Sequence, residues 1–247
     1  MDESSEAKVS VHNRLLAALI AEEYHRFSTR LERVHLSLGQ IIYHAGDLIE
    51  HVYFPETCVV SLISTMENGE TTEVGIIGKE GMVGIEVFLA GSRIHDQALV
   101  QAAGTAVILR AQVLSAVLKS GSPLQSLLLR YTQTLLAAVS QSAACNLHHT
   151  IEQRVARWLL AMSDTAETDE LQFTHEIISN LIGSRRAGVS EAASSLQDKG
   201  AIEYHRGNIS IVDRQKLEAV ACECYGVVRG DFDRLYSSQI TATDREH

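Results

Sequence analysis

The 247-residue sequence is short of the residues and patterns that mark several classes of protein. It has only two prolines, four cysteines and 5% aromatic residues, and its formal net charge is −10. No apolar run reaches the roughly 20 residues that a membrane-spanning helix requires. The segment MDESSEAKVS has neither the basic nor the apolar region of a signal peptide. We therefore expect a cytoplasmic protein with no membrane partner.

The cysteines are too scattered to form a recognisable metal motif. They lie at positions 58, 145, 222 and 224, without zinc-finger spacing or a CxxC pair. Cys222-Glu-Cys224 could supply half of a metal or redox site, because paired thiolates bind soft metals or oxidise. No second pair lies nearby in the sequence, which favours one thiol packed inward and the other idle. No cofactor and no metal site is therefore predicted.

The short motifs of common enzymes are also missing. The sequence contains no GxSxG, Walker loop, HExxH or Rossmann glycine fingerprint. His148 and His149 are adjacent, so on a helix they would point to different sides, which favours a cap or interface role over joint metal ligation. None of the eleven histidines stands out as a haem ligand. We expect a protein that is not an enzyme.

The apolar pattern divides the chain into parts. Hydrophobic residues make up 45% of the sequence, enough for two packed cores. Residues 1–122 combine a leading helix with short Val/Ile/Tyr/Phe runs between turn signals, a texture typical of a β-sandwich or barrel. Asn68-Gly69 predicts a hairpin, because this pair accepts the positive φ values of a type I′ turn.

A long helix is predicted over 123–149, with a seam of apolar and small residues in alternating steps of four and three. The seam consists of Leu124, Leu128, Tyr131, Leu135, Ala138, Ser142 and Cys145. A helix between two domains is a natural place for two chains to pair, so a dimerisation helix is predicted. The alternative is that this face packs on the chain's own barrel. A helix from about Thr150 to Met162 and a loop over Ser163–Glu170 are expected next.

Residues 173–212 have the pattern of a winged helix-turn-helix. A helix capped by Thr174 precedes Gly183, which supplies a tight turn. A second helix, expected over 184–198, opens with two arginines and carries apolar residues at helical spacing. Two short β runs follow within 201–212. The second helix of such a module enters a DNA major groove, so we predict a regulator of transcription.

The acidity of the whole chain counts against DNA binding, but it is unevenly distributed. From Leu171 to Lys216 there are six Lys or Arg residues against five Asp or Glu residues. The predicted DNA-binding segment is therefore neutral to slightly basic. We expect a salt-sensitive affinity that dimerisation raises.

The order of elements and several segments resemble the Crp/Fnr superfamily, to which the cyclic-AMP receptor protein belongs. The segments HVYFPETCVVSLISTMENGE, VGIIGKEGMVG, HTIEQRVARWLL and LEAVACECYGVV are similar to those of one subgroup. The resemblance implies an α+β fold: a cyclic-nucleotide-binding-like β-barrel (jelly roll), a dimerisation helix over 123–149, a winged helix-turn-helix over 150–225 and a C-terminal extension over 226–247. It also implies a homodimer on near-palindromic double-stranded DNA, an unknown small-molecule effector, and RNA polymerase as a further partner.

The resemblance carries six candidate DNA-binding residues over to this chain: Ser184, Arg185, Arg186, Ser190, Glu191 and Arg206. Arg186 stands where family members commonly place an arginine that contacts guanine through O6 and N7. Ser184 and Arg185 suit phosphate or base contact at the helix start, and Ser190 lies one turn after Arg186. Glu191 departs from the base-reading arginine of the cyclic-AMP receptor; it would accept from a cytosine N4 or point away. Arg206, in the wing, suits a phosphate.

The barrel departs from the family's cyclic-nucleotide-binding pattern, a Gly-Glu-Leu segment followed by Arg-Ser or Arg-Thr. In an ungapped alignment Gly84 stands at the ribose-binding glutamate, and Asp96 and Gln97 stand at the arginine and the hydroxyl residue. Asp96 would repel a phosphate, and Arg93 could replace the arginine only after a loop rearrangement. No cysteine precedes Cys58, which also excludes the iron–sulfur arrangement of some members. We predict an effector other than a cyclic nucleotide, or none.

A second class of function stays open. The chain could be a ligand-binding or interaction module whose helix-turn-helix no longer binds DNA. The acidic composition and Glu191 both favour this interpretation. Loss of DNA binding at every salt concentration would distinguish it from a regulator.

Overall fold

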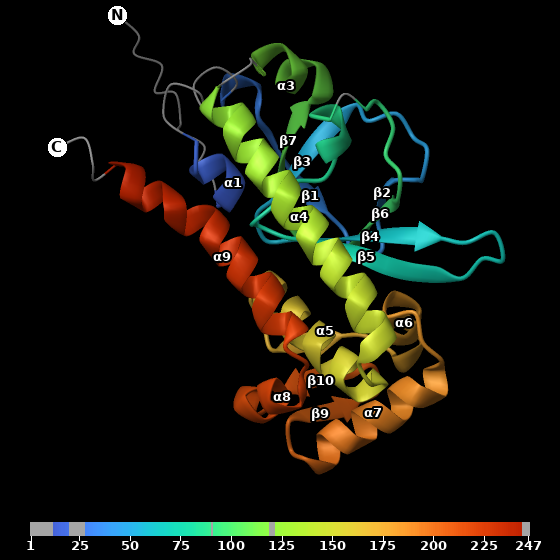
Figure 1. The fold of residues 1–247 in the computed structure, drawn as a ribbon. Coiled ribbons are helices and arrows are strands. Elements are labelled where there is room, and N and C mark those ends of the chain that lie inside the picture. Colours follow the sequence, from blue (N-terminus) through green and yellow to red (C-terminus); the bar gives the residue numbers. More distant parts are fainter. Residues whose placement is uncertain (1–11, 20–27, 90, 119–121, 244–247) are drawn as a thin grey trace, which may run out of the picture.

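The structure, a computed structural model, describes residues 12–19, 28–89, 91–118 and 122–243. A β-rich N-terminal part lies at one end and a smaller winged part at the other (Figure 1). Two long helices, α4 and α9, run side by side along the molecule and connect the two parts (Figure 1). Within the described residues, no helix combines the length and hydrophobicity needed to span a membrane.

The N-terminal part contains two antiparallel sheets, as the alternating β pattern predicts. One sheet has the order β1-β7-β3, formed by Glu32–Leu36, Gly104–Arg110 and His51–Pro55. The other has the order β2-β6-β4-β5, formed by Ile41–Tyr43, Gln97–Ala102, Val59–Thr65 and Thr71–Ile77. Apolar side chains such as Val52, Val60 and Val107 are fully buried in this part. Their burial accounts for the stability of a fold with only short strands.

Short helices complete the barrel. They are α1 (Arg14–Ala17), η1 (Ser28–Arg30), η2 (Ile85–Val87) and α3 (Ala111–Val117). Asn13 caps α1 and also donates its side-chain amide to the carbonyls of Pro55 and Gly81, which ties this short helix to the barrel. The leading helix is predicted from the sequence over Val11–Phe27. Within the described part α1 ends at Ala17, and residues 20–27 lie outside that part.

The hairpin between β4 and β5 forms where Asn68-Gly69 predicts it, but its turn differs from the predicted type. Gly69 has a φ of 83°, whereas Asn68 does not adopt a positive φ. The type I′ prediction for this pair is therefore wrong, because such a turn needs positive φ at both central residues. Main-chain bonding from Met66 to Glu70 instead closes a longer loop.

Helix α4 spans Pro123–His148, close to the predicted range, and begins at a Ser122 cap followed by proline. The predicted seam faces the interior of the same chain. Leu124, Leu128 and Tyr131 join the barrel core, and Cys145 is also fully buried. The alternative interpretation, packing on the chain's own barrel, is therefore correct for the N-terminal half of this face, whereas Cys145 packs with Cys222 and Cys224. The seam does not itself supply a surface for a partner.

The winged part packs around α5. Its elements are α5 (Ile151–Ala166), β8 (Glu170–Gln172), α6 (His175–Leu181), α7 (Arg186–Asp198), β9 (Ile202–His205), β10 (Asn208–Ile211) and α8 (Arg214–Val220). Thr150 and Gln153 form a reciprocal capping box at the start of α5. The predicted loop over Ser163–Glu170 is wrong at both ends, because α5 continues to Ala166 and Glu170 already pairs in a three-stranded sheet of order β8-β10-β9.

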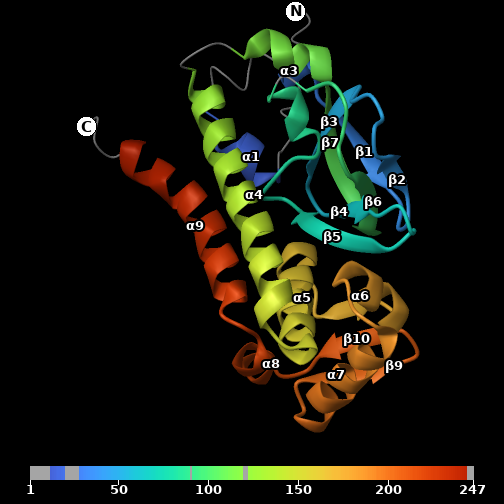
Figure 2. The ribbon, with the colours of Figure 1, turned by 45° about the vertical axis from the view of Figure 1, so that its right-hand side comes forward.

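Helix α9 spans Cys224–Thr243 and contains most of the predicted C-terminal extension. It runs back from the winged part to the barrel, beside α4 (Figure 2). Near its far end Leu235 and Tyr236 are buried against the barrel, and the Tyr236 hydroxyl donates to the carbonyl of Glu80. The Arg14 guanidinium lies 4.5 Å from the centre of the Tyr236 ring. The last helix therefore fastens the winged part to the barrel.

Candidate nucleic-acid interface

The turn between α6 and α7 is held from several sides. Thr174 caps α6 by accepting a hydrogen bond from the Ile177 amide at 3.2 Å. Gly183 has a φ of 60°, and the following Ser184 amide donates to the Ser179 carbonyl at 2.8 Å. The buried Arg154 of α5 donates to the carbonyl of Ile182 in the same turn. These contacts fix the angle at which α7 leaves the module.

The recognition helix begins two residues later than predicted. Arg185 is its N-cap residue, with extended φ and ψ of −82° and 139°, and Arg186 is the first helical residue. Val189 and Leu196 are fully buried on the inner face. A side chain at Gly188 would bring its Cβ within 2.5 Å of Ile151 Cδ1, so glycine allows α5 and α7 to cross closely. Ser184 and Arg185 therefore belong to the turn rather than to the helix.

The N-terminal end of α7 presents positive charge to solvent. Arg185 is exposed, and the Arg186 side chain is 70% exposed. One guanidinium nitrogen of Arg186 lies 3.3 Å from a carboxylate oxygen of Glu176, whose side chain is 65% exposed. An ion pair between two exposed side chains contributes about 0–1 kcal/mol, so it holds Arg186 only weakly. The Arg186 guanidinium is therefore accessible at the surface.

Ser190 has partners inside the module. Its hydroxyl donates to the Arg186 carbonyl at 3.1 Å and lies 3.0 Å from Nδ1 of His175. The His175 ring stacks on Tyr204 of the wing, with 4.1 Å between ring centres. Burial, and then the positive charge of Arg186, lower the pKa of His175. This cluster joins α6, α7 and the wing, and sequence patterns gave no signal of it because its members are 14 to 29 residues apart.

Glu191 and Arg206 are both exposed. Glu191 lies on the solvent side of α7, opposite the buried residues. Arg206 and Gly207 form the two-residue turn between β9 and β10, with φ values of 49° and 87°. Positive φ at both positions is the signature of a type I′ hairpin, which therefore occurs in the wing and not at Asn68-Gly69. The turn places Arg206 at the tip of the wing.

The barrel segment aligned with cyclic-nucleotide sites is described by Gly84, Arg93 and the contact of Tyr131 with Met82. Gly84 adopts a φ of 93°, and a Cβ there would lie 3.2 Å from side-chain atoms of Ile49 and Val52. Arg93 donates to the carbonyl of Gly46 at 2.6 Å, at the surface. The Tyr131 hydroxyl accepts from the Met82 amide at 3.1 Å and donates to the Met82 carbonyl at 3.2 Å. At these two positions Gly84 therefore offers no carboxylate, and the Arg93 guanidinium is held by the main chain at the surface.

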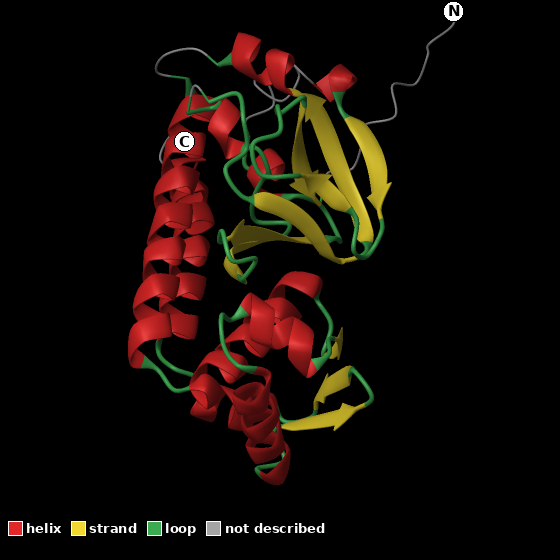
Figure 3. Ribbon diagram, turned by 90° about the vertical axis from the view of Figure 1, so that its right-hand side faces the viewer, coloured by secondary structure: helices red, strands yellow, loops and turns green. Residues whose placement is uncertain are grey.

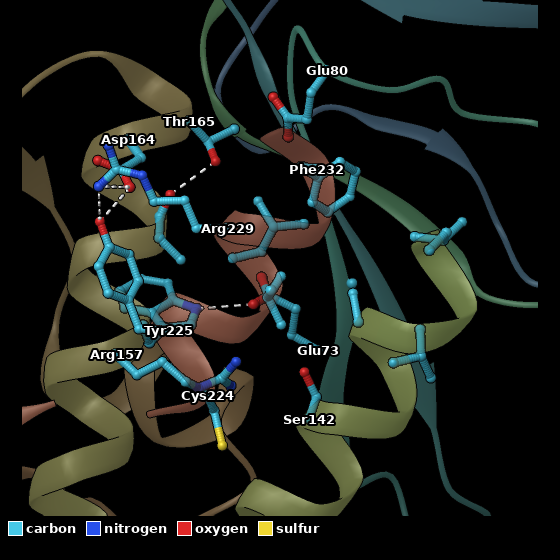
Figure 4. Close-up of a pocket in the computed structure, with 18 of the residues that line it drawn as sticks. Glu73, Glu80, Ser142, Arg157, Asp164, Thr165, Cys224, Tyr225, Arg229 and Phe232 are labelled. Carbon is cyan, nitrogen blue, oxygen red and sulfur yellow. Dashed lines mark hydrogen bonds and ion pairs between the residues drawn. The ribbon is translucent and has the colours of Figure 1, made fainter. Parts of the chain in front are cut away.

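A cavity of about 340 Å³ lies between β5, α4, α5 and α9 (Figure 4). The Glu73 carboxylate points into this region, where it accepts hydrogen bonds from Trp158 Nε1 at 2.9 Å and from the Ser61 hydroxyl. Burial raises the pKa of Glu73 to about 7. Because Glu73 belongs to the barrel and Trp158 to α5, this hydrogen bond joins the two parts of the molecule.

Two segments of the chain match known domain families. Residues 33–120 match the cyclic nucleotide-binding domain, and residues 153–220 match the Crp-like helix-turn-helix domain. The chain belongs to the Crp/Fnr family. It is a transcriptional regulator of the Crp/Fnr type, with a DNA-binding helix-turn-helix. The domain description names a fold and does not identify the effector of this chain.

Several relatives share this architecture. A global nitrogen regulator of Nostoc sp. is 26% identical over 183 residues, which cover 70% of this chain and 82% of the relative. The structure of FixK2 from Bradyrhizobium japonicum has a TM-score of 0.66 and 18% identity, covering 78% of this chain and 98% of FixK2. A putative regulator of the crp/fnr family from Eubacterium rectale has a TM-score of 0.64 and 22% identity, with coverage of 83% and 96%. At these identities the solved structures support the fold alone.

Proposed function

We propose that the chain binds near-palindromic double-stranded DNA as a homodimer, with the N-terminal end of α7 from each protomer in successive major grooves. The exposed Arg186 at the first turn of a well-supported α7 is the observation that carries this proposal. Its guanidinium matches the two acceptors of a guanine, while Ser184 and Arg185 lie beside it for phosphate contact. Arg206 at the wing tip meets the flanking backbone. Glu191 accepts from a cytosine, and Ser190 contacts DNA only if its hydroxyl leaves His175.

The dimer forms through a second seam on α4, on the face that the chain leaves exposed. This seam again advances in steps of four and three: Leu129, Gln133, Leu136, Ser140, Ala143 and Leu147. Its leucines are 53%, 65% and 81% exposed, which is unusual for large apolar residues along one helix. Pairing of two α4 helices would bury them and place the two winged parts on the same side of the dimer.

The barrel responds to an effector other than a cyclic nucleotide, or to none. Two observations support this choice: the side chains of Ile49 and Val52 lie close to Gly84, and the Arg93 guanidinium is bonded to the Gly46 carbonyl at the surface. The protein acts in the cytoplasm, where it meets DNA and RNA polymerase, and it carries out no catalysis. A chain that keeps the fold but no longer binds DNA remains the alternative, favoured by the acidic net charge and by Glu191.

Footprinting tests the arrangement. A duplex selected by the purified protein from a random library would be cleaved by hydroxyl radicals with and without protein. We expect two protected regions whose centres are about one helical turn apart, as two symmetric recognition helices require. A single protected region, or uniform protection of any duplex, would contradict the dimeric arrangement.

A further inference from the structure

Four potential metal ligands meet where α4, α5, α8 and α9 end or begin. They are Cys145 near the end of α4, His149 between α4 and α5, Cys222 after α8, and Cys224 at the start of α9. Their ligand atoms all lie within 4.8 Å of one another. All three cysteines are buried, and the His149 side chain is 17% exposed. The expectation that one of the paired thiols is idle is therefore wrong, and the missing second half of the site comes from residues about 75 positions earlier.

We propose that Cys145, His149, Cys222 and Cys224 form a tetrahedral site for one zinc ion. Three thiolates and one imidazole are a ligand set that zinc takes in closed structural sites, without an open position for catalysis. The site goes beyond the DNA-binding function proposed above and does not depend on it. The sequence analysis predicted no cofactor because the cysteines are scattered along the chain. The proposal replaces that prediction, because the fold brings three of them together with His149.

The distances suit such a site. The sulfur atoms of Cys145 and Cys222 are 3.5 Å apart, and the Cys224 sulfur lies 3.6 Å from Nδ1 of His149. With zinc–sulfur bonds of about 2.3 Å and zinc–nitrogen bonds of about 2.0 Å, the edges of a tetrahedron are roughly 3.8 and 3.5 Å long. All separations lie within 4.8 Å, so a bound ion would have to draw the most distant ligand atoms together by no more than about 1 Å. Small side-chain rotations provide that movement.

The surroundings support the same assignment. The other ring nitrogen of His149, Nε2, lies 3.2 Å from a Glu223 carboxylate oxygen, an arrangement that orients a metal-binding imidazole. Gln141 donates to the Cys224 sulfur at 3.0 Å. Arg154 and Arg157 lie close enough to act electrostatically on Cys145. Three thiolates with one zinc ion carry a net charge of about −1, which these guanidinium groups offset.

The site would clasp the junction between the long helices and the winged part. Cys145 and His149 bracket the link from α4 to α5, and Cys222 and Cys224 bracket the link from α8 to α9. Figure 3 shows the two long helices side by side, with the winged part beside their lower ends. A bound ion would join all four helix ends at one point. It would therefore hold the winged part in a set orientation to α4, and its loss would loosen that orientation.

Metal analysis of the full chain, purified in reductant without a histidine tag, tests the proposal. We expect about one zinc per chain, retained through dialysis. The double variant Cys222→Ser/Cys224→Ser should lose it, whereas Cys58→Ala should keep it, because Cys58 is buried in the barrel core. Thermal unfolding should show a lower Tm after a strong chelator removes the ion from the unmutated chain.

Cobalt gives a readout that does not depend on how the variants fold. Metal-free wild-type chain titrated with Co²⁺ should develop the intense visible and near-ultraviolet bands of tetrahedral cobalt bound to thiolates, saturating at about one equivalent. A chain that contains no zinc and shows no such bands, with its cysteines reduced, would overturn the proposal. Iron with acid-labile sulfide, or a disulfide between these cysteines in the purified chain, would overturn it as well.

Discussion

Arg186 and Glu191 are the two charged side chains in the first six residues of α7, and both are exposed. Arginine donates two parallel hydrogen bonds to a guanine, whereas glutamate can only accept, which suits the amino group of cytosine. The sequence predicted the helix and the exposure of both residues, because the spacing of the apolar residues identified the face of the helix that packs inward. It could not predict that the Ser190 hydroxyl meets His175, since this contact depends on how α6 and the wing pack.

Replacing Arg186 by alanine tests base recognition. The variant should lose about 1–3 kcal/mol of specific binding and relax the preference at one base pair in each half-site. Fluorescence anisotropy with the selected duplex and single-base substitutions would measure this loss. Arg30→Ala is the matched control, because Arg30 is an exposed arginine on the barrel and should bind as the parent does. Equal binding of every duplex by Arg186→Ala and by the parent would show that α7 is wrongly placed.

At the scale of elements, α4 carries two seams offset by five residues. One runs from Leu124 to Cys145 and packs inside the chain, and the other runs from Leu129 to Leu147 and is exposed. Heptad spacing predicted the helix and one seam, but periodicity alone cannot say which face meets which partner. The sequence did not predict that α9 connects the winged part to the barrel. The helix has few apolar residues, and they are buried only where α9 packs against α4 and the barrel.

The exposed seam makes dimerisation testable. Leu136→Glu places a charge at the centre of the proposed contact, where two copies would face each other without water. We expect the molecular mass measured by light scattering to fall to that of a monomer at concentrations where the parent is a dimer. Leu48→Glu, a 55% exposed leucine on the barrel, is the control and should remain dimeric. A dimeric Leu136→Glu variant would exclude this seam as the interface.

The contact of Tyr131 with the barrel gives a second test at this scale. Tyr131→Phe would leave both the amide and the carbonyl of Met82 buried without their partner. The free energy of unfolding should fall by about 1–3 kcal/mol, as measured by urea denaturation. Tyr204→Phe serves as the control, because Tyr204 is only partly buried. A loss no larger than that of the control would mean that the Tyr131 hydroxyl does not anchor α4.

At the scale of the whole molecule, the barrel and the winged part meet through apolar packing, in which Val59 and Ile63 of β4 join the core around Trp158, and through a few contacts near it. Glu73 meets Trp158, and the turn at Gly183 lies against Thr72 of β5. Separate cores were predictable from the two apolar patterns, whereas contacts between them join residues about 85 to 110 positions apart. The same reason explains why the cluster around Cys145 escaped prediction from spacing.

Glu73 should make stability depend on pH. Because its pKa is raised from 4.5 to about 7 in the folded chain, the folded state binds a proton that the unfolded state releases. Stability from this group is full below pH 4.5 and falls as the pH rises to about 7. Relative to Glu73→Gln, the parent should therefore lose free energy of unfolding between pH 4.5 and about pH 7, measured by urea denaturation. Parallel curves for the two proteins would place the pKa of Glu73 near its ordinary value.

The most direct measurement is a fluorescence-anisotropy titration without added effector. It compares the selected duplex with a scrambled duplex of the same length, at two salt concentrations. We predict selective binding that weakens as salt increases, because phosphate contacts release counterions. We also predict that added cyclic AMP leaves the affinity unchanged. Equal affinity for both duplexes, or selectivity that appears only with cyclic AMP, would contradict the account of a cyclic-nucleotide-independent DNA-binding regulator.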